Sequence, residues 1–289
     1  MKSPIFIIGN PRSGTTLLRL MLTCHRNIVI PPECSFAVWW YQKYRNWNSE
    51  SAKQNLDAFL DDLFGSKKIE TWNLNRELLR ETLSEKEPES YSDLVSLIYE
   101  KFAMQQKETF KRLGDKNNYY LNHIETIFEL FSDVQFIHIV RDGRDIACSY
   151  KKLAVSKFDS KYAPQLPTEI SEIAREWINN LKKIKKSFQT IGWDKVIEIR
   201  YEDLVTESEK TLRNICSFLN EEYDPSMSDF YLLNMEKELE PRELMQWKGK
   251  TLEKPTRSEV EKYQIELTLP EIKEFEIIAE ELLAHYRYL

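Results

Sequence analysis

Glycine and cysteine are scarce in this chain, and long apolar runs are absent. Only seven glycines occur in 289 residues, which excludes a linker-rich or low-complexity chain. The four cysteines form no CxxC pair and no spacing typical of zinc, so we expect reduced intracellular thiols. No stretch of about 18 apolar residues exists, so no membrane span is predicted. The apolar run after Met1 ends at Gly9 and is too short for a signal peptide, which predicts a cytoplasmic protein.

An excess of positive charge is also missing. Lys and Arg number 41 against 47 Asp and Glu, which gives a formal net charge of −6. This balance argues against a protein that wraps nucleic acid, which usually needs a net basic face. A small anionic ligand is compatible with it, because a local basic pocket can exist on an acidic protein. The chain is long enough to bury a core without a metal or a disulfide.

Apolar runs that contain β-branched residues alternate with helical patterns along the sequence. Residues 4–8, 134–140 and 196–200 are typical of strands, and 119–121 is a shorter candidate. Helical patterns occupy 15–22, 146–154, 169–190 and 270–287, and 36–112 is helical throughout. This order predicts the α/β class, with a P-loop-like parallel sheet flanked by helices and a helical insertion, 36–112, after the first βα unit. The turns at the carboxyl ends of such strands lie on one edge.

The turn after the first strand nearly matches a phosphate-binding loop. Residues 9–16 read Gly-Asn-Pro-Arg-Ser-Gly-Thr-Thr, against the pattern G-x-x-x-x-G-K-[ST]. The glycines let backbone N–H groups turn inward, and the helix that begins at Thr15 adds its positive end. Thr15 stands where a nucleotide triphosphatase has the lysine that contacts the β- and γ-phosphates. Arg12 supplies a cation instead, so the loop suits a diphosphate-length group, and a P-loop kinase with a relocated cation is the alternative.

Residues 11–17 resemble the 5′-phosphosulfate loop of sulfotransferases that use 3′-phosphoadenosine 5′-phosphosulfate (PAPS). The arginine at position 12 is similar to the tyrosylprotein and bacterial branches of that family. The resemblance covers 4–36, 114–154 and 201–204. It implies a single sulfotransferase domain over 1–289, PAPS as the donor and no metal. The cofactor-binding residues that it implies in the loop are Pro11, Arg12, Ser13, Gly14, Thr15, Thr16 and Leu17.

The second βα turn resembles the family's 3′-phosphate site. The resemblance assigns that phosphate to Arg141 and to Ser149, which lies about two helical turns further along. A surface salt bridge of Arg141 with Asp142 or Asp145 is the alternative. Arg144 and Asp145 are expected to brace the following helix. Tyr201 matches a family residue near the adenine, although a core tyrosine is a nearly equal reading, and Arg257 and Lys262 are the candidates for a basic contact from the C-terminal third.

Sulfuryl transfer needs a base for the acceptor and a cation for the departing phosphate oxygen. Glu33 follows two prolines, 21 residues after Arg12, and the tyrosylprotein branch carries a catalytic glutamate after a similar interval. We therefore predict Glu33 as the base and Arg12 as the cation, with an ion-pair or loop carboxylate as the alternative for Glu33. His25 and His123 are rival bases, of which His25 is more often a helix cap, and Lys116 is a candidate contact of the sulfuryl group or the acceptor.

The acceptor is not identified by the sequence. A hydroxyl or amine of a small molecule, a sugar or a peptide fits the predicted chemistry, and no oligomeric state is predicted. The insertion 36–112 is expected to cover the acceptor side. Its aromatic residues suit a sugar face, a phenol or an acyl chain, although core packing explains them as well. They are Phe36, Trp39, Trp40, Tyr41, Tyr44, Trp47 and Trp72.

Overall fold

A parallel sheet forms the middle of the molecule. The computed structural model describes residues 3–289, and within them the sheet has five strands in the order β2-β3-β1-β4-β5. Every pair of neighbours runs parallel. The predicted parallel α/β fold is therefore confirmed. The strands are β1 (Ile5–Gly9), β2 (Ile28–Val29), β3 (Arg112–Lys116), β4 (Gln135–Val140) and β5 (Val196–Arg200).

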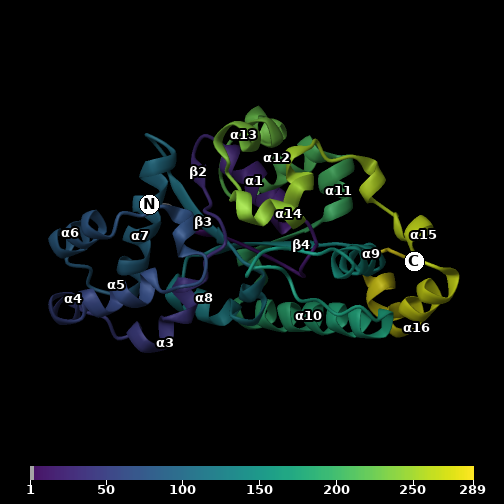
Figure 1. The fold of residues 1–289 in the computed structure, drawn as a ribbon, viewed down its shortest axis with the longest axis horizontal. Helices are drawn as coiled ribbons and strands as arrows, with labels where there is room; N and C mark the ends of the chain where they lie inside the picture. The colour runs from purple at the N-terminus through teal and green to yellow at the C-terminus, as the bar shows by residue number, and fades with distance from the viewer. Residues whose placement is uncertain (1–2) are drawn as a thin grey trace.

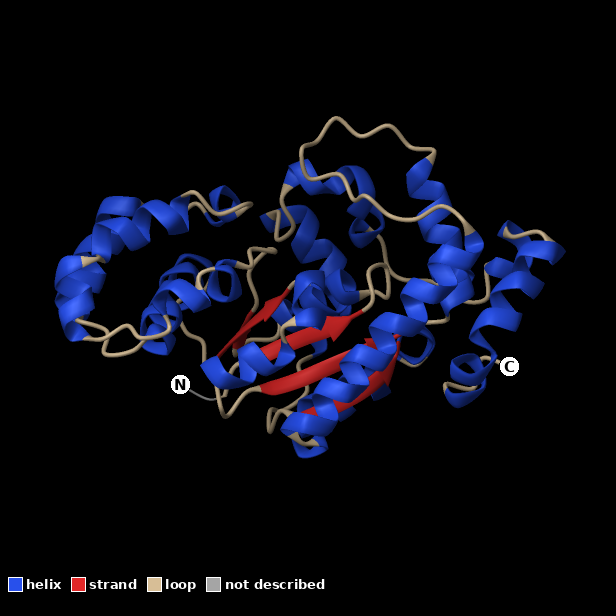
Figure 2. Ribbon diagram, turned by 90° about the horizontal axis from the view of Figure 1, so that it is seen from below, coloured by secondary structure: helices blue, strands red, loops and turns tan. Residues whose placement is uncertain are grey.

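Both faces of the sheet are buried, which explains why β1 and β4 are almost continuously apolar. Ile5 and Ile7 of β1 pack into one hydrophobic cluster, and Phe6 and Ile8 pack into another. Figures 1 and 2 show helices on either side of the strands. Four helices pack on the face of the sheet that carries Ile5 and Ile7. They are α1 (Thr15–Cys24), α11 (Tyr201–Thr206), α12 (Ser208–Phe218) and α13 (Phe230–Lys237).

The opposite face of the sheet packs against α7 (Tyr91–Gln106), α8 (Ile124–Leu130) and the 22-residue α10 (Ile170–Ile191). A third cluster joins α10 to α9 (Gly143–Ala154) and α16 (Leu269–His285). Pro270 lies in the first turn of α16, where a capping box joins Thr268 to Glu271. The predicted helices 146–154, 169–190 and 270–287 are thus confirmed.

The predicted insertion is a group of helices at one end of the sheet (Figure 2). They pack around a core of their own aromatic and aliphatic residues that is continuous with the core under β1. Besides α7, the helices of this segment are α2 (Phe36–Trp39), α3 (Tyr41–Tyr44), α4 (Ser49–Gln54), α5 (Leu56–Phe64), η1 (Ile69–Trp72) and α6 (Arg76–Lys86).

Short helices connect the remaining elements. Many of them are single 3₁₀ turns, which are common as connectors. The short helices are η2 (Asn118–Asn122), η3 (Trp193–Lys195), η4 (Pro225–Asp229), η5 (Arg242–Leu244), α14 (Met245–Lys248), η6 (Gly249–Leu252), η7 (Arg257–Glu259) and α15 (Tyr263–Glu266).

One predicted strand is wrong, and two strands were not predicted. Residues 119–121 lie in the 3₁₀ helix η2 and not in a strand. The strand of this region is β3. It begins at Arg112, the last residue of the segment 36–112 that was expected to be helical. β3 reads Arg-Leu-Gly-Asp-Lys, which carries no apolar run although all five residues are buried. β2 is only two residues long. β3 lacks the continuous apolar pattern by which the others were recognised, and the two apolar residues of β2 are too short a run to indicate a strand.

All four cysteines are free thiols and buried. None of the helices within residues 3–289 combines the length and the apolar character that a membrane-spanning segment requires.

Candidate functional site

The loop between β1 and α1 has the conformation of an anion cradle. Gly14 has a φ of +91°, and a Cβ atom at this position would lie 2.5 Å from the Tyr201 ring, so only glycine fits. Arg12 also has a positive φ, 70°, which is a strained conformation for a residue with a side chain. The first helical hydrogen bond of α1 runs from Leu18 N to Gly14 O, so the preceding N–H groups of the first turn have no partner within the helix.

Asn10 fixes this loop to a distant helix. Its Oδ1 accepts a hydrogen bond of 2.6 Å from Asn180 Nδ2 of α10, and its own Nδ2 donates to the Pro11 carbonyl at 3.0 Å. Asn10 is buried, so these amide contacts hold the loop against the long helix. No motif marks Asn180, because its partner lies 170 residues away.

A second set of side chains lies where β4 ends. Arg12 Nε donates to Ser149 Oγ at 3.0 Å, and Arg12 Nη2 donates to the Trp247 carbonyl at 3.2 Å. Arg141 Nη1 donates to the Arg12 carbonyl at 3.1 Å, and the Arg141 guanidinium carbon lies 4.1 Å from the centroid of the Tyr201 ring. The structure therefore brings Arg12, Arg141, Ser149 and Tyr201 together at the carboxyl edge.

The two arginines of this set lack a carboxylate partner. Within residues 3–289 neither Arg12 nor Arg141 forms an ion pair, and the buried Ser13 Oγ and Arg141 Nε have no hydrogen-bond partner. Burial lowers the pKa of Arg12, and the charge of Arg141 lowers it further. Two adjacent guanidinium groups and two unpartnered polar atoms fit an anionic group such as phosphate.

The alternative for Arg141, a salt bridge to Asp142 or Asp145, is wrong. Asp142 pairs with Arg144 at 2.8 Å and caps α9. Asp145 accepts hydrogen bonds from the backbone N–H groups of Glu261 and Tyr263. Arg144 and Asp145 thus brace α9, as predicted, and Arg141 is left for another partner.

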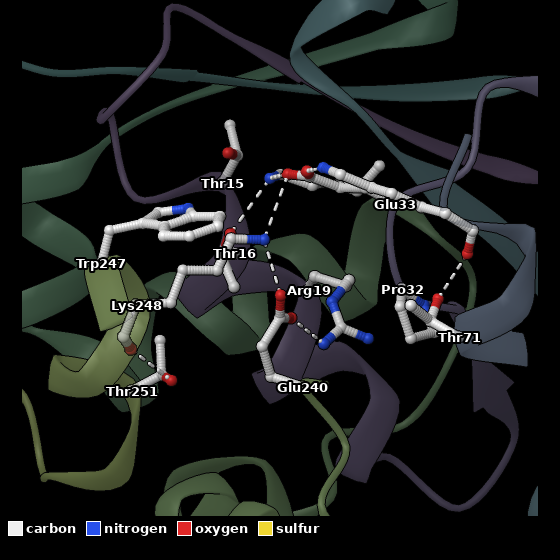
Figure 3. Close-up of polar contacts among 12 residues, drawn as sticks. Thr15, Thr16, Arg19, Pro32, Glu33, Thr71, Glu240, Trp247, Lys248 and Thr251 are labelled. Atoms are coloured by element: carbon white, nitrogen blue, oxygen red, sulfur yellow. Dashed lines mark hydrogen bonds and ion pairs between the residues drawn. The ribbon is translucent and has the colours of Figure 1, made fainter. Parts of the chain in front are cut away.

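Glu33 is buried and lies among three lysines, of which two are buried and one is half-buried; Figure 3 labels Glu33 and Lys248. Its Oε1 atom accepts a short hydrogen bond from Lys116 and lies 3.4 Å from Lys248 Nζ. Its Oε2 atom lies 2.6 Å from Lys68 Nζ. Burial alone would raise the pKa of Glu33, but the three ammonium charges outweigh it and hold the pKa well below the usual glutamate value. The structure therefore shows Glu33 in ion pairs, which is the alternative that the sequence analysis left open for this residue.

Two further ion pairs extend this cluster. Lys248 Nζ lies 2.6 Å from Glu240 Oε1, and Glu240 Oε2 lies 2.5 Å from Arg19 of α1 (Figure 3). Lys116 Nζ also donates to Thr16 Oγ1 at 3.0 Å, which connects the cluster to the cradle. Among residues 3–289 the cluster holds four cations and two carboxylates, Arg19, Lys68, Lys116, Lys248, Glu33 and Glu240, so its formal charge is +2.

The match to known proteins agrees with this arrangement of cradle and cations. The model of the sulfotransferase family matches residues 4–225.

The chain belongs to the sulfotransferase family.

Relatives and solved structures are similar to this sulfotransferase family member over most of its length. A protein-tyrosine sulfotransferase of Drosophila melanogaster is 26% identical over 219 residues, which are 75% of this chain and 38% of the relative. The sulfotransferase domain of the Synechococcus PCC 7002 olefin synthase has a TM-score of 0.61 at 24% identity and covers 98% of this chain and 96% of its own. Mouse sulfotransferase SULT7A1, complexed with PAP, has a TM-score of 0.51 at 15% identity over 96% of this chain and 83% of its own.

The chain spans about half the length of the curated relatives it matches. Its membership in the sulfotransferase family does not favour the kinase alternative, which predicted transfer of a phosphate from a nucleotide.

Of the rival bases in this sulfotransferase family member, His25 is the helix cap that the sequence favoured. It is the C-cap residue of α1, and it is buried. Its Nε2 lies 2.8 Å from the Glu222 carbonyl, and its Nδ1 accepts from Asn27 N. His123 lies between η2 and α8, with its ring 4.2 Å from that of Tyr119. Lys116, by contrast, lies directly in the Glu33 cluster.

Lys262, rather than Arg257, lies near the arginines of the second set. Lys262 is buried, and burial and the charge of Arg141 lower its pKa. Arg257 is exposed in η7. The carbonyl of Glu259, in the same η7 turn, accepts a hydrogen bond from Arg141 Nη2 at 2.8 Å, so this segment closes over the end of β4.

The aromatic residues of the insertion mostly form its core. Phe36 and Trp72 are fully buried and meet edge to face, with ring centroids 5.6 Å apart. Tyr44 and Trp47 are buried in the same cluster. Core packing therefore accounts for Phe36, Tyr44, Trp47 and Trp72, whereas Trp39, Trp40 and Tyr41 are half-buried. The insertion contributes the polar residue Lys68 to the site.

Sequence reasoning missed Lys68, Glu240 and Lys248. Lys68 precedes η1 within a run of polar residues, and it has a positive φ of 73°. Glu240 and Lys248 lie beyond residue 225, where the family match ends. A pair of opposite charges eight residues apart is too common in sequences to indicate a site.

Proposed function

We propose that this protein transfers the sulfuryl group of PAPS to a hydroxyl or amine of an acceptor, as a metal-independent sulfotransferase. The observation that carries the proposal is a surplus of buried and half-buried cations on both sides of the glycine loop. Arg12 and Arg141 lie on one side, and the lysines around Glu33 lie on the other. The PAP complex of the mouse relative supports a donor of this class.

The donor fits the polar groups that have no partner in the protein. The N–H groups of the first turn of α1 suit the 5′-phosphosulfate. Arg141 and Ser149 suit the 3′-phosphate, and Lys262 is the nearer of the two C-terminal candidates for a further contact. Tyr201, which packs on Gly14 and beneath Arg141, suits the nucleoside. The residues that we propose for donor binding are Pro11, Arg12, Ser13, Gly14, Thr15, Thr16, Leu17, Arg141, Ser149 and Tyr201.

The donor supplies an activated sulfur atom, and the side chains supply the proton transfer and the charge. Glu33 accepts the proton of the acceptor as the acceptor oxygen or nitrogen bonds to sulfur. The bond between sulfur and the 5′-phosphate oxygen breaks, and its electron pair stays on that oxygen. Arg12 and Lys116 neutralise the charge that develops there. For this role the Arg12 side chain exchanges its contact with Ser149 for the departing oxygen.

The acceptor binds on the side of the helical insertion. Lys68 of the insertion reaches Glu33, so an acceptor at this carboxylate lies against 36–112. A cavity of about 410 Å³ lies beside this region, between η1 of the insertion and the segment 237–243. Small-molecule, sugar and peptide acceptors remain alternatives, and the protein-tyrosine sulfotransferase relatives support a peptide.

The proposal of a reaction without a metal rests on the resemblance to the sulfotransferases that use PAPS. The four buried free cysteines support a cytoplasmic location, because free thiols are typical of reducing compartments. Activity that survives chelation by EDTA is the expected result, and its loss on chelation with rescue by Mg²⁺ would contradict metal independence.

Thermal unfolding tests donor binding, and mass spectrometry tests turnover. Adenosine 3′,5′-bisphosphate should raise Tm by several degrees more than ATP with Mg²⁺ at equal concentration. A panel of hydroxyl and amine acceptors with labelled PAPS should then yield a product that has gained one sulfate. Equal stabilisation by ATP with Mg²⁺, or phosphate gain in place of sulfate gain, would overturn the proposal.

A further inference from the structure

A closed ring of hydrogen bonds includes the residue that follows Arg141. The Asp142 N–H donates to Glu202 Oε1 at 3.0 Å, and the Tyr288 hydroxyl donates to Glu202 Oε2 at 2.9 Å. The Tyr288 carbonyl accepts a hydrogen bond of 2.6 Å from Arg144, which also pairs with Asp142 at 2.8 Å. The ring therefore joins the turn after β4 to α9, to α11 and to the segment that follows α16.

The hydrogen-bond ring is shielded from water. Asp142, Arg144 and Glu202 are buried, and Tyr288 is half-buried. A buried carboxylate is stable only when its oxygens accept hydrogen bonds, and the Asp142 N–H and the Tyr288 hydroxyl supply one for each oxygen of Glu202. Arg200 is a weaker partner, with its Nε 3.8 Å from Glu202 Oε2. Without the Tyr288 hydroxyl, Glu202 Oε2 would turn toward Arg200, and the hold on Asp142 would change.

Glu202 connects the two turns that carry the proposed nucleotide contacts. It directly follows Tyr201, whose ring centroid lies 4.1 Å from the guanidinium carbon of Arg141. Its side chain holds the N–H of Asp142, the residue directly after Arg141. One residue therefore fixes the backbone beside both Tyr201 and Arg141, and so sets how these two side chains lie relative to each other.

We propose that Glu202 and Tyr288 are positioning residues that make the donor site selective for a nucleotide with a 3′-phosphate. They act through Arg141, whose backbone they hold in place. A guanidinium binds phosphate best through two parallel hydrogen bonds, which require its plane and position to be fixed. A small shift of the turn weakens these bonds and leaves the contacts to the rest of the nucleotide intact. The inference rests on the proposed function, because it explains how the 3′-phosphate of the donor is selected.

No short motif identifies this pair of residues. Tyr288 lies beyond residue 225, where the family match ends, and it is 86 residues away from Glu202 in the sequence. The hydroxyl reaches the carboxylate because α16 packs against α9 and α10 in one hydrophobic cluster and returns the chain to the end of the sheet. The selectivity of the nucleotide site therefore depends on a segment outside the matched region.

The test compares two nucleotides that differ only in the 3′-phosphate, adenosine 3′,5′-bisphosphate (PAP) and adenosine 5′-phosphate. Calorimetry on the full chain gives the ratio of the two affinities. Tyr288→Phe removes the hydroxyl and keeps the ring, and it should lower this ratio about threefold. Glu202→Ala removes the acceptor of the Asp142 N–H, and it should lower the ratio about tenfold. The affinity for adenosine 5′-phosphate should stay within about twofold of the wild type in both variants.

Two further variants separate positioning from general stabilisation. Glu202→Gln keeps a side-chain oxygen for the Asp142 N–H, so its ratio should stay within about twofold of the wild-type ratio. Tyr223→Phe is the matched control, because it also removes a hydroxyl contact, 3.0 Å from Ser228 Oγ, in a segment that packs at the C-terminal end of α1. It should leave the ratio unchanged.

The outcomes distinguish this inference from the proposed function. If wild-type protein prefers PAP, and Tyr288→Phe and Glu202→Ala lower Tm but keep the wild-type ratio, the ring only stabilises the fold and the inference is wrong. An equal fall of the ratio in Tyr223→Phe would overturn it as well. If wild-type protein does not prefer PAP, the proposed donor site is itself wrong. Circular dichroism verifies folding, and Tyr288→Phe alone decides the test if Glu202→Ala does not fold.

Discussion

Arg12 Nε donates a hydrogen bond of 3.0 Å to Ser149 Oγ, across 137 residues of sequence. The two residues belong to different βα units, and they meet because β1 and β4 are adjacent and parallel. The contact joins the glycine loop to the helix that follows the second turn. It places both parts of the proposed donor site within reach of one side chain.

Arg12→Ala should lower kcat by about 10²- to 10³-fold, because it removes a cation from the departing oxygen. The affinity for PAP should fall as well, since the same substitution removes the contact with Ser149. Steady-state kinetics and calorimetry measure the two effects. Arg213→Ala, on an exposed face of α12, is the control and should change neither. Wild-type turnover in Arg12→Ala would show that another cation serves the departing oxygen.

Glu33→Gln should lower kcat by about 10²- to 10⁴-fold with PAP affinity within about twofold, because the proposed base acts on the acceptor and not on the nucleotide. His25→Gln and His123→Gln, measured in parallel, test the rival bases and should retain most of the activity. Full activity of Glu33→Gln, or a loss confined to His123→Gln, contradicts the assignment of the base.

Gly14→Ala should destabilise the fold by about 1–3 kcal/mol and weaken PAP binding, because Gly14 has a positive φ and a Cβ atom there meets the Tyr201 ring. Gly249→Ala is a matched control, since no atom lies within 4 Å of a Cβ at that position. Urea unfolding of both variants measures the difference. Equal stability of the two variants would show that the loop relaxes without cost.

Asp115 should give the stability of the protein a distinct pH dependence. Burial raises the pKa of this carboxyl, which accepts hydrogen bonds from Tyr99 and Tyr120, from an ordinary 3.8 to about 7. Between these values the folded chain binds more protons than the unfolded chain, so the contribution of Asp115 lowers the free energy of unfolding as pH rises through this window. Asparagine cannot ionise, so this contribution to the fall in the free energy of unfolding is absent from Asp115→Asn.

The measurement is urea unfolding of the wild type and of Asp115→Asn at pH 5, 6, 7 and 8. The stability of the variant relative to the wild type should improve from pH 5 to about pH 7 and then level off. Asp61→Asn, at an exposed position on α5, should show a constant difference from the wild type. A constant difference for Asp115→Asn as well would mean that its carboxyl ionises in the folded chain as it does in the unfolded one.

The predictable part of the fold is the part that buries apolar side chains. β1 and β4 were recognised because strands covered on both faces are almost continuously apolar. β3 was not, because Arg112, Asp115 and Lys116 are buried through ion pairs and hydrogen bonds rather than through apolar contact. The strand misplaced to 119–121 is a 3₁₀ turn whose Tyr120 is buried against the core.

The predictable part of the site consists of residues within short motifs. Arg12, Arg141 and Ser149 stand in two strand–turn–helix units, and parallel topology brings such turns to one edge. Glu33 was found through the resemblance to the tyrosylprotein branch, which carries a glutamate after a similar interval, but its three lysine partners were not. They come from the insertion, from β3 and from α14, and their charges act together only through the fold.

The sequence by itself determined the parallel sheet, the glycine loop and the two arginines, because strand burial and loop geometry impose local patterns of residues. Only the tertiary structure decided which charges surround Glu33 and where the Arg12 side chain lies. Electrostatic interaction depends on distance in space and on burial. Neither quantity can be read from the positions of Lys68, Lys116 and Lys248 along the chain.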